Sequence, residues 1–167
     1  MAIDDELAQI IQQERTLVFP EFSEAIAFKL GSDIRTYALN AGLGIACEIR
    51  TGERPLFHMA LPGTTADNAN WLRRKANVVH RLGKSSYRAV LEHKEPQNYC
   101  GPRRGLDNMD YALAGGGFPI WVKHAGMIGS ICVSGLHERD DHRVVVEVLC
   151  AHLGQEAMDF ALPALSG

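Results

Sequence analysis

The sequence lacks two features that would mark a membrane or nucleic-acid-binding protein: a long apolar run and an excess of basic residues. A helix that crosses a bilayer needs roughly 20 consecutive, mostly apolar residues, and no segment of these 167 residues approaches that length. The formal net charge is −3 at pH 7, whereas proteins that coat nucleic acid or anionic membranes are basic. We therefore expect neither a nucleic acid nor a membrane as a partner.

Cysteine is scarce as well, and its spacing excludes the usual zinc and redox motifs. The four cysteines, Cys47, Cys100, Cys132 and Cys150, form no C-x-x-C pair and have no histidine at zinc-finger spacing. Most of them lie in apolar runs, which favours buried free thiols over disulfides or metal ligands. Residues 1–15 lack the basic start and the apolar stretch of a signal peptide, so we expect a cytoplasmic protein without a structural metal.

What the sequence does have is the composition of an ordinary globular protein, with 46% hydrophobic and 22% charged residues. Its length is comfortable for one domain. We therefore expect a single domain over 1–167, with a core at about 22–154. The helix predicted at 4–15 and the apolar tail at 157–167 would be peripheral segments or contacts between subunits.

The spacing of apolar residues predicts helices and strands along most of the chain. Steps of three and four residues indicate helices, and strict alternation indicates strands. The expected helices lie at 4–15, at 22–41, at 67–92 with an interruption near 83–86, and from near 137–141 onward. The expected strands lie at 43–50, 56–61, 111–114, 118–123 and 127–134. Because hairpins join antiparallel neighbours, the predicted fold class is α/β of the α+β type: an antiparallel sheet of about five strands with helices packed on its faces.

The segment from Gly115 to Gly135, GGGFPIWVKHAGMIGSICVSG, resembles the signature region of the haem-degrading-domain superfamily. That superfamily includes glycolate-operon proteins and haem-binding, HbpS-like sensors. Lys75, on a helix that follows a β-hairpin, also matches. The run WLRRKANVVHRLGKSS, Trp71 to Ser86, resembles an uncharacterised branch, and the whole resemblance covers roughly Phe22 to Gly154.

This resemblance implies a profilin-like or PAS-like sheet. It also implies homo-oligomers, from dimers up to rings. Some members of the superfamily bind haem or another tetrapyrrole. The resemblance therefore makes haem the one candidate cofactor.

Basic residues concentrate in the helix predicted after the hairpin. No acidic residue lies between Asp67 and Glu92, and the window holds Arg73, Arg74, Lys75, Arg81, Lys84 and Arg88. In a continuous helix, the arginines spaced by seven residues would share a face. Arg74, Lys75 and Arg81 are therefore candidates to hold a carboxylate, a phosphate or haem propionates. A solvated face, or one that pairs with acidic residues of a neighbouring subunit, is the alternative.

Two histidines and a glycine block complete the candidate ligand site. His58, in an apolar stretch of the second predicted strand, and His80 are the candidate axial ligands if iron is involved. Alternation in the strand can equally turn His58 toward solvent. Gly115, Gly116 and Gly117 would line the opposite side of the site, although a bulge or a close backbone approach explains three glycines equally well.

No arrangement of residues in the sequence indicates a catalytic site. Asp141 and His142 are adjacent, so they do not point at each other on a helix, and helix capping explains the acid. Ser134 lacks the G-x-S-x-G elbow of a hydrolase. Cys100 lies near arginines that would favour its thiolate, but a spectator thiol is the simpler interpretation.

Two functional hypotheses follow. In the first, the chain is a homo-oligomeric protein that binds haem or a small anionic ligand between the basic helix and the glycine-rich turn. In the second, it is an oligomeric adaptor without small-molecule chemistry. A weaker third is an enzyme that acts on a small carboxylate, suggested by the glycolate connection. Convergence of Arg74 and Arg81 on a concave surface would favour the first hypothesis, and a flat or subunit-covered face the second.

Overall fold

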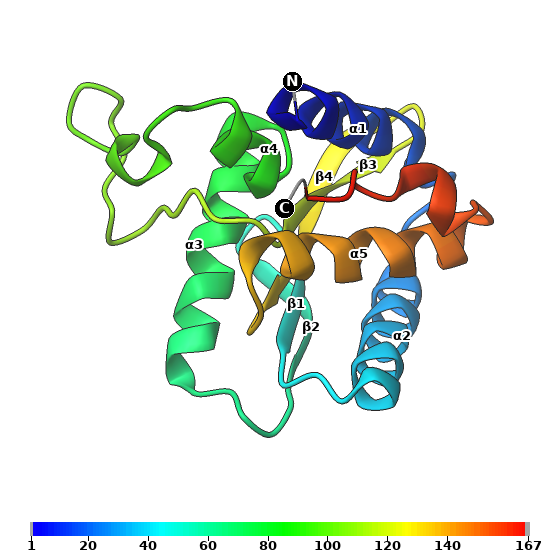
Figure 1. The fold of residues 1–167 in the computed structure, drawn as a ribbon. Coiled ribbons are helices and arrows are strands. Elements are labelled where there is room, and N and C mark those ends of the chain that lie inside the picture. Colours follow the sequence, from blue (N-terminus) through cyan, green and yellow to red (C-terminus); the bar gives the residue numbers. More distant parts are fainter. Residues whose placement is uncertain (1, 166–167) are drawn as a thin grey trace.

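The computed structural model describes residues 2–165, which form a four-stranded antiparallel sheet with helices on both faces (Figure 1). The strand order across the sheet is β2-β1-β4-β3. The strands are β1 (Ala46–Thr51), β2 (Arg54–Ala60), β3 (Gly117–Val122) and β4 (Gly126–Ser134). The helices are α1 (Ala2–Thr16), α2 (Glu24–Ala41), α3 (Ala66–Leu82), α4 (Ser86–Leu91) and α5 (Glu138–Leu153), with short 3-10 helices η1 (Pro96–Asn98) and η2 (Ala157–Phe160). None of the helices within residues 2–165 is long and apolar enough to span a membrane.

The alternation of side chains along the strands divides the sheet between two layers of helices. Ile49 of β1 and Ile131 of β4 point into the main hydrophobic core, which α2 and α5 cover. Ala46 and Cys132 have the opposite parity and pack with Leu72 of α3 on the other face. The predicted α+β class, with an antiparallel sheet and helices on its faces, is confirmed.

The sheet has four strands rather than the expected five or so, because residues 111–114 form no strand. The backbone N–H of Ala112 donates to Arg74 O of α3 at 3.4 Å, and that of Ala114 donates to Ala112 O at 3.0 Å. This stretch therefore lies beside α3 and does not join the sheet. Four residues are too few for an apolar alternation to distinguish a strand from an irregular segment.

Helix ends fall where the sequence predicts them. Gly42 (φ 67°) ends α2 and Gly83 (φ 68°) ends α3, in a left-handed conformation that glycine adopts without a Cβ clash. Thr65 begins α3 with a capping box, in which its side chain accepts from Asp67 N and Asn68 Oδ1 accepts from Thr65 N. The interruption expected near 83–86 is thus a true helix end, and α4 is a separate helix.

A buried chain of hydrogen bonds joins the two terminal segments to the core. Gln13 of α1 donates its Nε2 hydrogen to Phe160 O at 2.6 Å, and its Oε1 lies 2.8 Å from His142 Nε2 of α5. Leu17 and Phe160 both belong to the main hydrophobic core. The core therefore extends beyond residues 22–154, while a contact of either terminal segment with another subunit stays a prediction.

His142 is expected to make the fold sensitive to acid. It is fully buried, and this burial, followed by the nearby charge of Arg139, lowers the pKa of its imidazole from 6.5 to about 3. Between these two values the unfolded chain binds a proton that the folded chain excludes. The free energy of unfolding should therefore decrease as the pH falls through this window, by up to about 1.4 kcal/mol per pH unit, as measured by urea unfolding.

The matched control is His142→Gln, which keeps an N–H donor for Gln13 and cannot titrate. All other residues are the same in both proteins, so only the difference between them reports on His142. The variant should lose less stability than the wild type between neutral and acidic pH. Parallel losses in the two proteins would contradict this role of His142.

Candidate functional site

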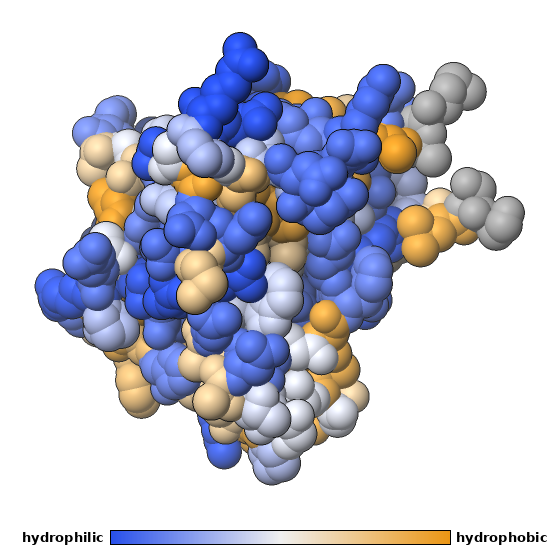
Figure 2. Space-filling view, turned by 90° about the vertical axis from the view of Figure 1, so that its left-hand side faces the viewer, coloured by the Kyte–Doolittle hydropathy of each residue, from blue (hydrophilic) through white to orange (hydrophobic). Residues whose placement is uncertain are grey.

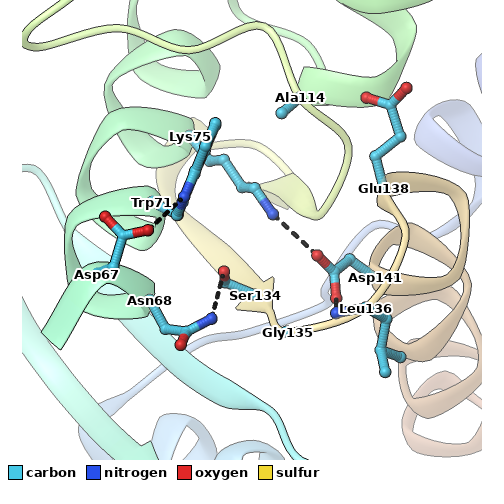
Figure 3. A pocket seen from close by; sticks show the side chains of 10 residues that line it. All are labelled: Asp67, Asn68, Trp71, Lys75, Ala114, Ser134, Gly135, Leu136, Glu138 and Asp141. Atoms are coloured by element: carbon cyan, nitrogen blue, oxygen red, sulfur yellow. Dashed lines mark hydrogen bonds and ion pairs between the residues drawn. The ribbon is translucent and has the colours of Figure 1, made fainter. Parts of the chain in front are cut away.

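A polar pocket lies where the start of α3, the end of β4 and the start of α5 meet (Figure 3). Its volume is about 310 Å³. The residues that line it are Asp67, Asn68, Trp71, Lys75, Ala114, Ser134, Gly135, Leu136, Glu138 and Asp141. We call it the Lys75 pocket, because that side chain crosses it from α3 toward α5.

A buried ion pair forms one wall of the Lys75 pocket. Lys75 Nζ lies 3.0 Å from Asp141 Oδ2 and donates to Val133 O, also at 3.0 Å. The two charged side chains are only 4% and 3% exposed. Asp141 Oδ1 accepts a hydrogen bond from Leu136 N at 2.9 Å, so the same carboxylate also shapes the turn between β4 and α5. Burial raises the pKa of Asp141, and the charge of Lys75 opposes that rise.

The glycine block is needed because this wall leaves no room for side chains. A Cβ on Gly116 (φ 126°) would lie 2.4 Å from Val133 O and 2.9 Å from Lys75 Nζ. A Cβ on Gly115 would lie 2.4 Å from Glu138 O. Gly115 and Gly116 thus let the chain pass close to both α5 and the buried lysine, which is the close backbone approach considered from the sequence.

Two further polar contacts fix the mouth of the pocket. Asn68 Nδ2 donates to Ser134 Oγ at 3.2 Å, and Trp71 Nε1 donates to Asp67 Oδ2 at 3.2 Å. Ser134 is 4% exposed. Because Asn68 also belongs to the capping box of α3, the helix start, the last residue of β4 and the pocket share one set of hydrogen bonds.

Arg74 and Arg81 do not converge on this pocket with Lys75. Arg74 Nε donates to Asn108 O at 3.0 Å, and its guanidinium group lies 4.8 Å from the centre of the Trp71 ring. Arg81 is exposed and extends toward Gly105, and its side chain makes no ion pair or hydrogen bond with any described residue. Seen from the α3 side of the molecule, hydrophilic residues predominate (Figure 2).

The third arginine of the predicted basic face lies on a different helix. Arg88 belongs to α4, and it pairs with Glu14 of α1 and with Glu92, each at 2.8 Å. Lys84 also pairs with Glu92, at 2.6 Å. The condition for a shared face over 67–92, a continuous helix, is therefore not met, because α3 ends at Leu82.

His58 and His80 lie on the α3 face of the sheet, and neither lines the Lys75 pocket. His58 Nδ1 is 3.1 Å from Glu48 Oε2, and the His58 side chain is 43% exposed. His80 Nε2 is 3.0 Å from Ser130 Oγ. Burial, followed by the charge of Arg50, lowers the pKa of His80. The two histidines thus have different environments, and only His58 is well exposed.

The surroundings of Cys100 and His142 give neither side chain a reactive form. Burial raises the pKa of the Cys100 thiol, and the charge of Arg74 opposes this without reversing it, so the arginines do not produce a thiolate. His142 is fully buried and is not available as a general acid or base. Within residues 2–165, no group of three or more His, Cys, Asp and Glu side chains is arranged to hold a metal ion.

The sequence made Lys75 a candidate because of the basic residues around it, and it did not assign Ser134, Asn68, Trp71 and Asp141 to the site. One signal for Lys75 was present: it lies three residues after Leu72 and four before Val79, on the apolar side of α3. A lysine on an apolar face needs a buried acidic partner. No local rule identifies that partner as Asp141, which lies 66 residues away.

The sequence of this chain matches a family model and is similar to curated proteins. Residues 22–150 match the model of a family described as haem degrading protein, HbpS-like. A UPF0303 protein of Mesorhizobium japonicum is 54% identical over 154 residues, which are 92% of this chain and 92% of that protein.

Solved structures share the fold at lower identity. The crystal structure of Ybr137w protein has a TM-score of 0.79 at 24% identity, with 92% of each chain covered. The PduOC:Heme complex has a TM-score of 0.62 at 15% identity, covering 80% of this chain and 95% of that one. At such identities the likeness concerns the fold alone.

Removing the lysine charge should destabilise the domain. Lys75→Met leaves Asp141 buried without its partner, and breaking a buried ion pair in this way costs about 3–5 kcal/mol. We expect a loss of that order in the free energy of unfolding, measured with urea at neutral pH.

The matched variant is Lys75→Met with Asp141→Asn. The amide keeps an acceptor for Leu136 N and carries no charge, so the double variant should regain a measurable part of the lost stability. If Lys75→Met and the double variant are equally unstable, the unpaired charge is not the cause.

Proposed function

This chain belongs to the HbpS-like family of haem-degrading proteins, and from that relationship we propose that it is a binding protein whose Lys75 pocket takes a small molecule with one carboxylate group. The observation that carries the proposal is that a buried ammonium group and the Ser134 hydroxyl group line the same preformed pocket. With about 310 Å³, the pocket lies at the lower end of the range for small-ligand sites, roughly 300–1,000 Å³.

Donors in the Lys75 pocket suit a carboxylate. Lys75 has three N–H groups, of which Val133 O and Asp141 Oδ2 accept two. Ser134 Oγ accepts from Asn68, which leaves its own hydroxyl hydrogen for a ligand. The start of α5, with Leu136 and Glu138 in the lining, adds the positive end of a helix dipole.

The acidic residues of the lining select against a second negative group. Asp141 is balanced by Lys75, but Asp67 and Glu138 each bring a carboxylate to the pocket. Their field opposes every negative group of a ligand, so it disfavours a dianion more strongly than a monocarboxylate, whereas a hydroxyl or an amino group beside the ligand carboxylate would be attracted to them. The pocket therefore favours a small hydroxy acid or amino acid over a dicarboxylate.

Ser134→Ala tests this assignment with little risk to the fold, because it removes one hydroxyl group. We expect isothermal titration calorimetry to give saturable binding of glycolate or glycine to the wild type and none of the uncharged analogue ethylene glycol. The variant should bind at least about tenfold more weakly, since a hydrogen bond to a charged group contributes about 1.5–3 kcal/mol.

The control is Ser130→Ala, on the same strand. Ser130 is also buried, but it contacts His80 and lies outside the lining of the pocket. Its loss should leave the affinity unchanged. The proposal fails if neither acid binds saturably, or if the two serine variants weaken binding equally.

Haem is the second candidate ligand. The exposed position of His58 and its contact with Glu48 favour it. Haem does not fit the Lys75 pocket, since none of its ten described lining residues is a His, Cys, Met or Tyr. His58 is different: Glu48 contacts its Nδ1, and a carboxylate that holds one ring nitrogen orients the other toward a metal. A haem held there would supply an iron centre for redox chemistry. The PduOC:Heme complex shares the fold.

A haemin titration followed by absorbance tests this second candidate. The wild type should give a saturable Soret shift, and His58→Ala should abolish it. His80→Ala is the matched control, because Ser130 already contacts the Nε2 atom of His80. An identical response in His58→Ala and the wild type would exclude His58 as the ligand.

A further inference from the structure

Lys75 differs from the other lysines of the chain because it is enclosed. Its side chain is 4% exposed, against 64% for Lys29 and 25% for Lys84, and Lys94 and Lys123 are exposed. It nevertheless lines a pocket of about 310 Å³. A lysine amine that has lost its proton is a nucleophile, and it forms Schiff bases with carbonyl compounds.

Asp141 is placed to take that proton. Its Oδ2 atom lies 3.0 Å from Lys75 Nζ, and both side chains are almost fully buried. Burial disfavours the charged form of each group, and transfer of the proton from the ammonium group to the carboxylate removes both charges at once. Burial also raises the pKa of Asp141, which is the direction that the transfer needs. Asp141 Oδ1 accepts from Leu136 N at 2.9 Å, so the carboxyl group stays oriented while Oδ2 gains and loses a proton.

A ligand carboxylate in the pocket would bring a carbonyl carbon to Lys75. The Ser134 hydroxyl and Lys75 Nζ would hold this carboxylate, and Figure 3 shows the Lys75 side chain reaching across the pocket toward Asp141. In a 2-oxo acid the carbonyl carbon is bonded directly to the carboxylate carbon. A carboxylate oxygen within hydrogen-bond distance of Nζ therefore places the carbonyl carbon near the separation of roughly 3–3.5 Å from which a bond can form.

We propose that Lys75 captures a small 2-oxo acid as a Schiff base, an inference that rests on the carboxylate-binding function proposed for the Lys75 pocket. Asp141 Oδ2 takes one proton from Lys75, and the nitrogen lone pair forms a bond to the carbonyl carbon while the carbon–oxygen π electrons move to the oxygen. A second proton passes from the nitrogen to that oxygen and gives a carbinolamine. Asp141 then gives its proton to the hydroxyl group, which leaves as water, and a protonated imine remains. No oxidant or reductant is needed, and water reverses the reaction.

The product keeps the charges of the buried wall in balance. The protonated imine carries the same positive charge as the ammonium group that it replaces, and Asp141 is again a carboxylate. A buried carboxylate without a cationic partner is costly, but here Asp141 is neutral whenever the Lys75 nitrogen is neutral. The ion pair that stabilises the resting fold therefore also supports the covalent step.

Reductive trapping of the full chain tests the proposal. Glyoxylate is the probe, because it is the smallest 2-oxo acid, and sodium cyanoborohydride at neutral pH converts a protonated imine into a stable amine. Peptide mass mapping should find one added carboxymethyl group on Lys75 at glyoxylate concentrations that leave the exposed Lys29 and Lys123 unmodified. Lys84 is the matched control in the same molecule, since it also pairs with a carboxylate, that of Glu92, but lies outside the pocket.

Two serine variants separate capture in the pocket from general reactivity. Ser134→Ala should require about tenfold more glyoxylate for half-modification of Lys75, because the ligand carboxylate loses one hydrogen bond. Ser130→Ala leaves the lining of the pocket unchanged and should behave as the wild type. Glycolate, which has no aldehyde or ketone group, should protect Lys75 by competition, whereas ethylene glycol should not.

Asp141→Asn tests the proton transfer. Its amide keeps an acceptor for Leu136 N but cannot take a proton from Lys75, so the rate of Lys75 modification should fall about a hundredfold or more. Circular dichroism shows whether this variant folds, and if it does not, the two serine variants decide.

The proposal is overturned by equal modification of Lys75 and the exposed lysines, or by unchanged modification of Lys75 in Ser134→Ala. If calorimetry shows that glycolate binds but glyoxylate is not trapped on Lys75, the Schiff base is wrong and the carboxylate-binding function stands. If glycolate does not bind and glyoxylate is not trapped, both fail.

Discussion

The buried pair of Lys75 and Asp141 is the contact on which this end of the fold depends. It joins α3 to α5 across the end of β4, and each partner has a second role: Lys75 binds Val133 O, and Asp141 binds Leu136 N. Two charges removed from water are tolerated only when such additional hydrogen bonds satisfy them. The pair therefore fixes the positions of three elements, and the candidate ligand pocket results from that constraint.

The same constraint accounts for the segment that carries the family resemblance. The glycine block must pass between an ammonium group, a carbonyl oxygen and the first turn of α5, and at Gly116 even a methyl group would collide. The glycine run thus has a packing role, whether or not the pocket binds a ligand.

Local rules predicted much of the fold from the sequence. Gly42, Gly83 and Thr65 end or begin helices for reasons contained within a few residues. The site was less predictable, because Arg74 and Lys75 are adjacent and so point about 100° apart on a helix. One faces a surface loop and the other the interior. The partner of Lys75 is distant in sequence, and only the tertiary fold brings it near.

The hydrogen-bond chain through Gln13 has a consequence for the order of folding during synthesis. Phe160, which accepts the hydrogen bond of Gln13, is made 147 residues after it. Until then, the buried side-chain amide of Gln13 lacks the acceptor for its hydrogen bond. Closure of the core around Gln13 therefore waits until Phe160 has been made, and until then the incompletely packed chain is exposed to chaperones and proteases.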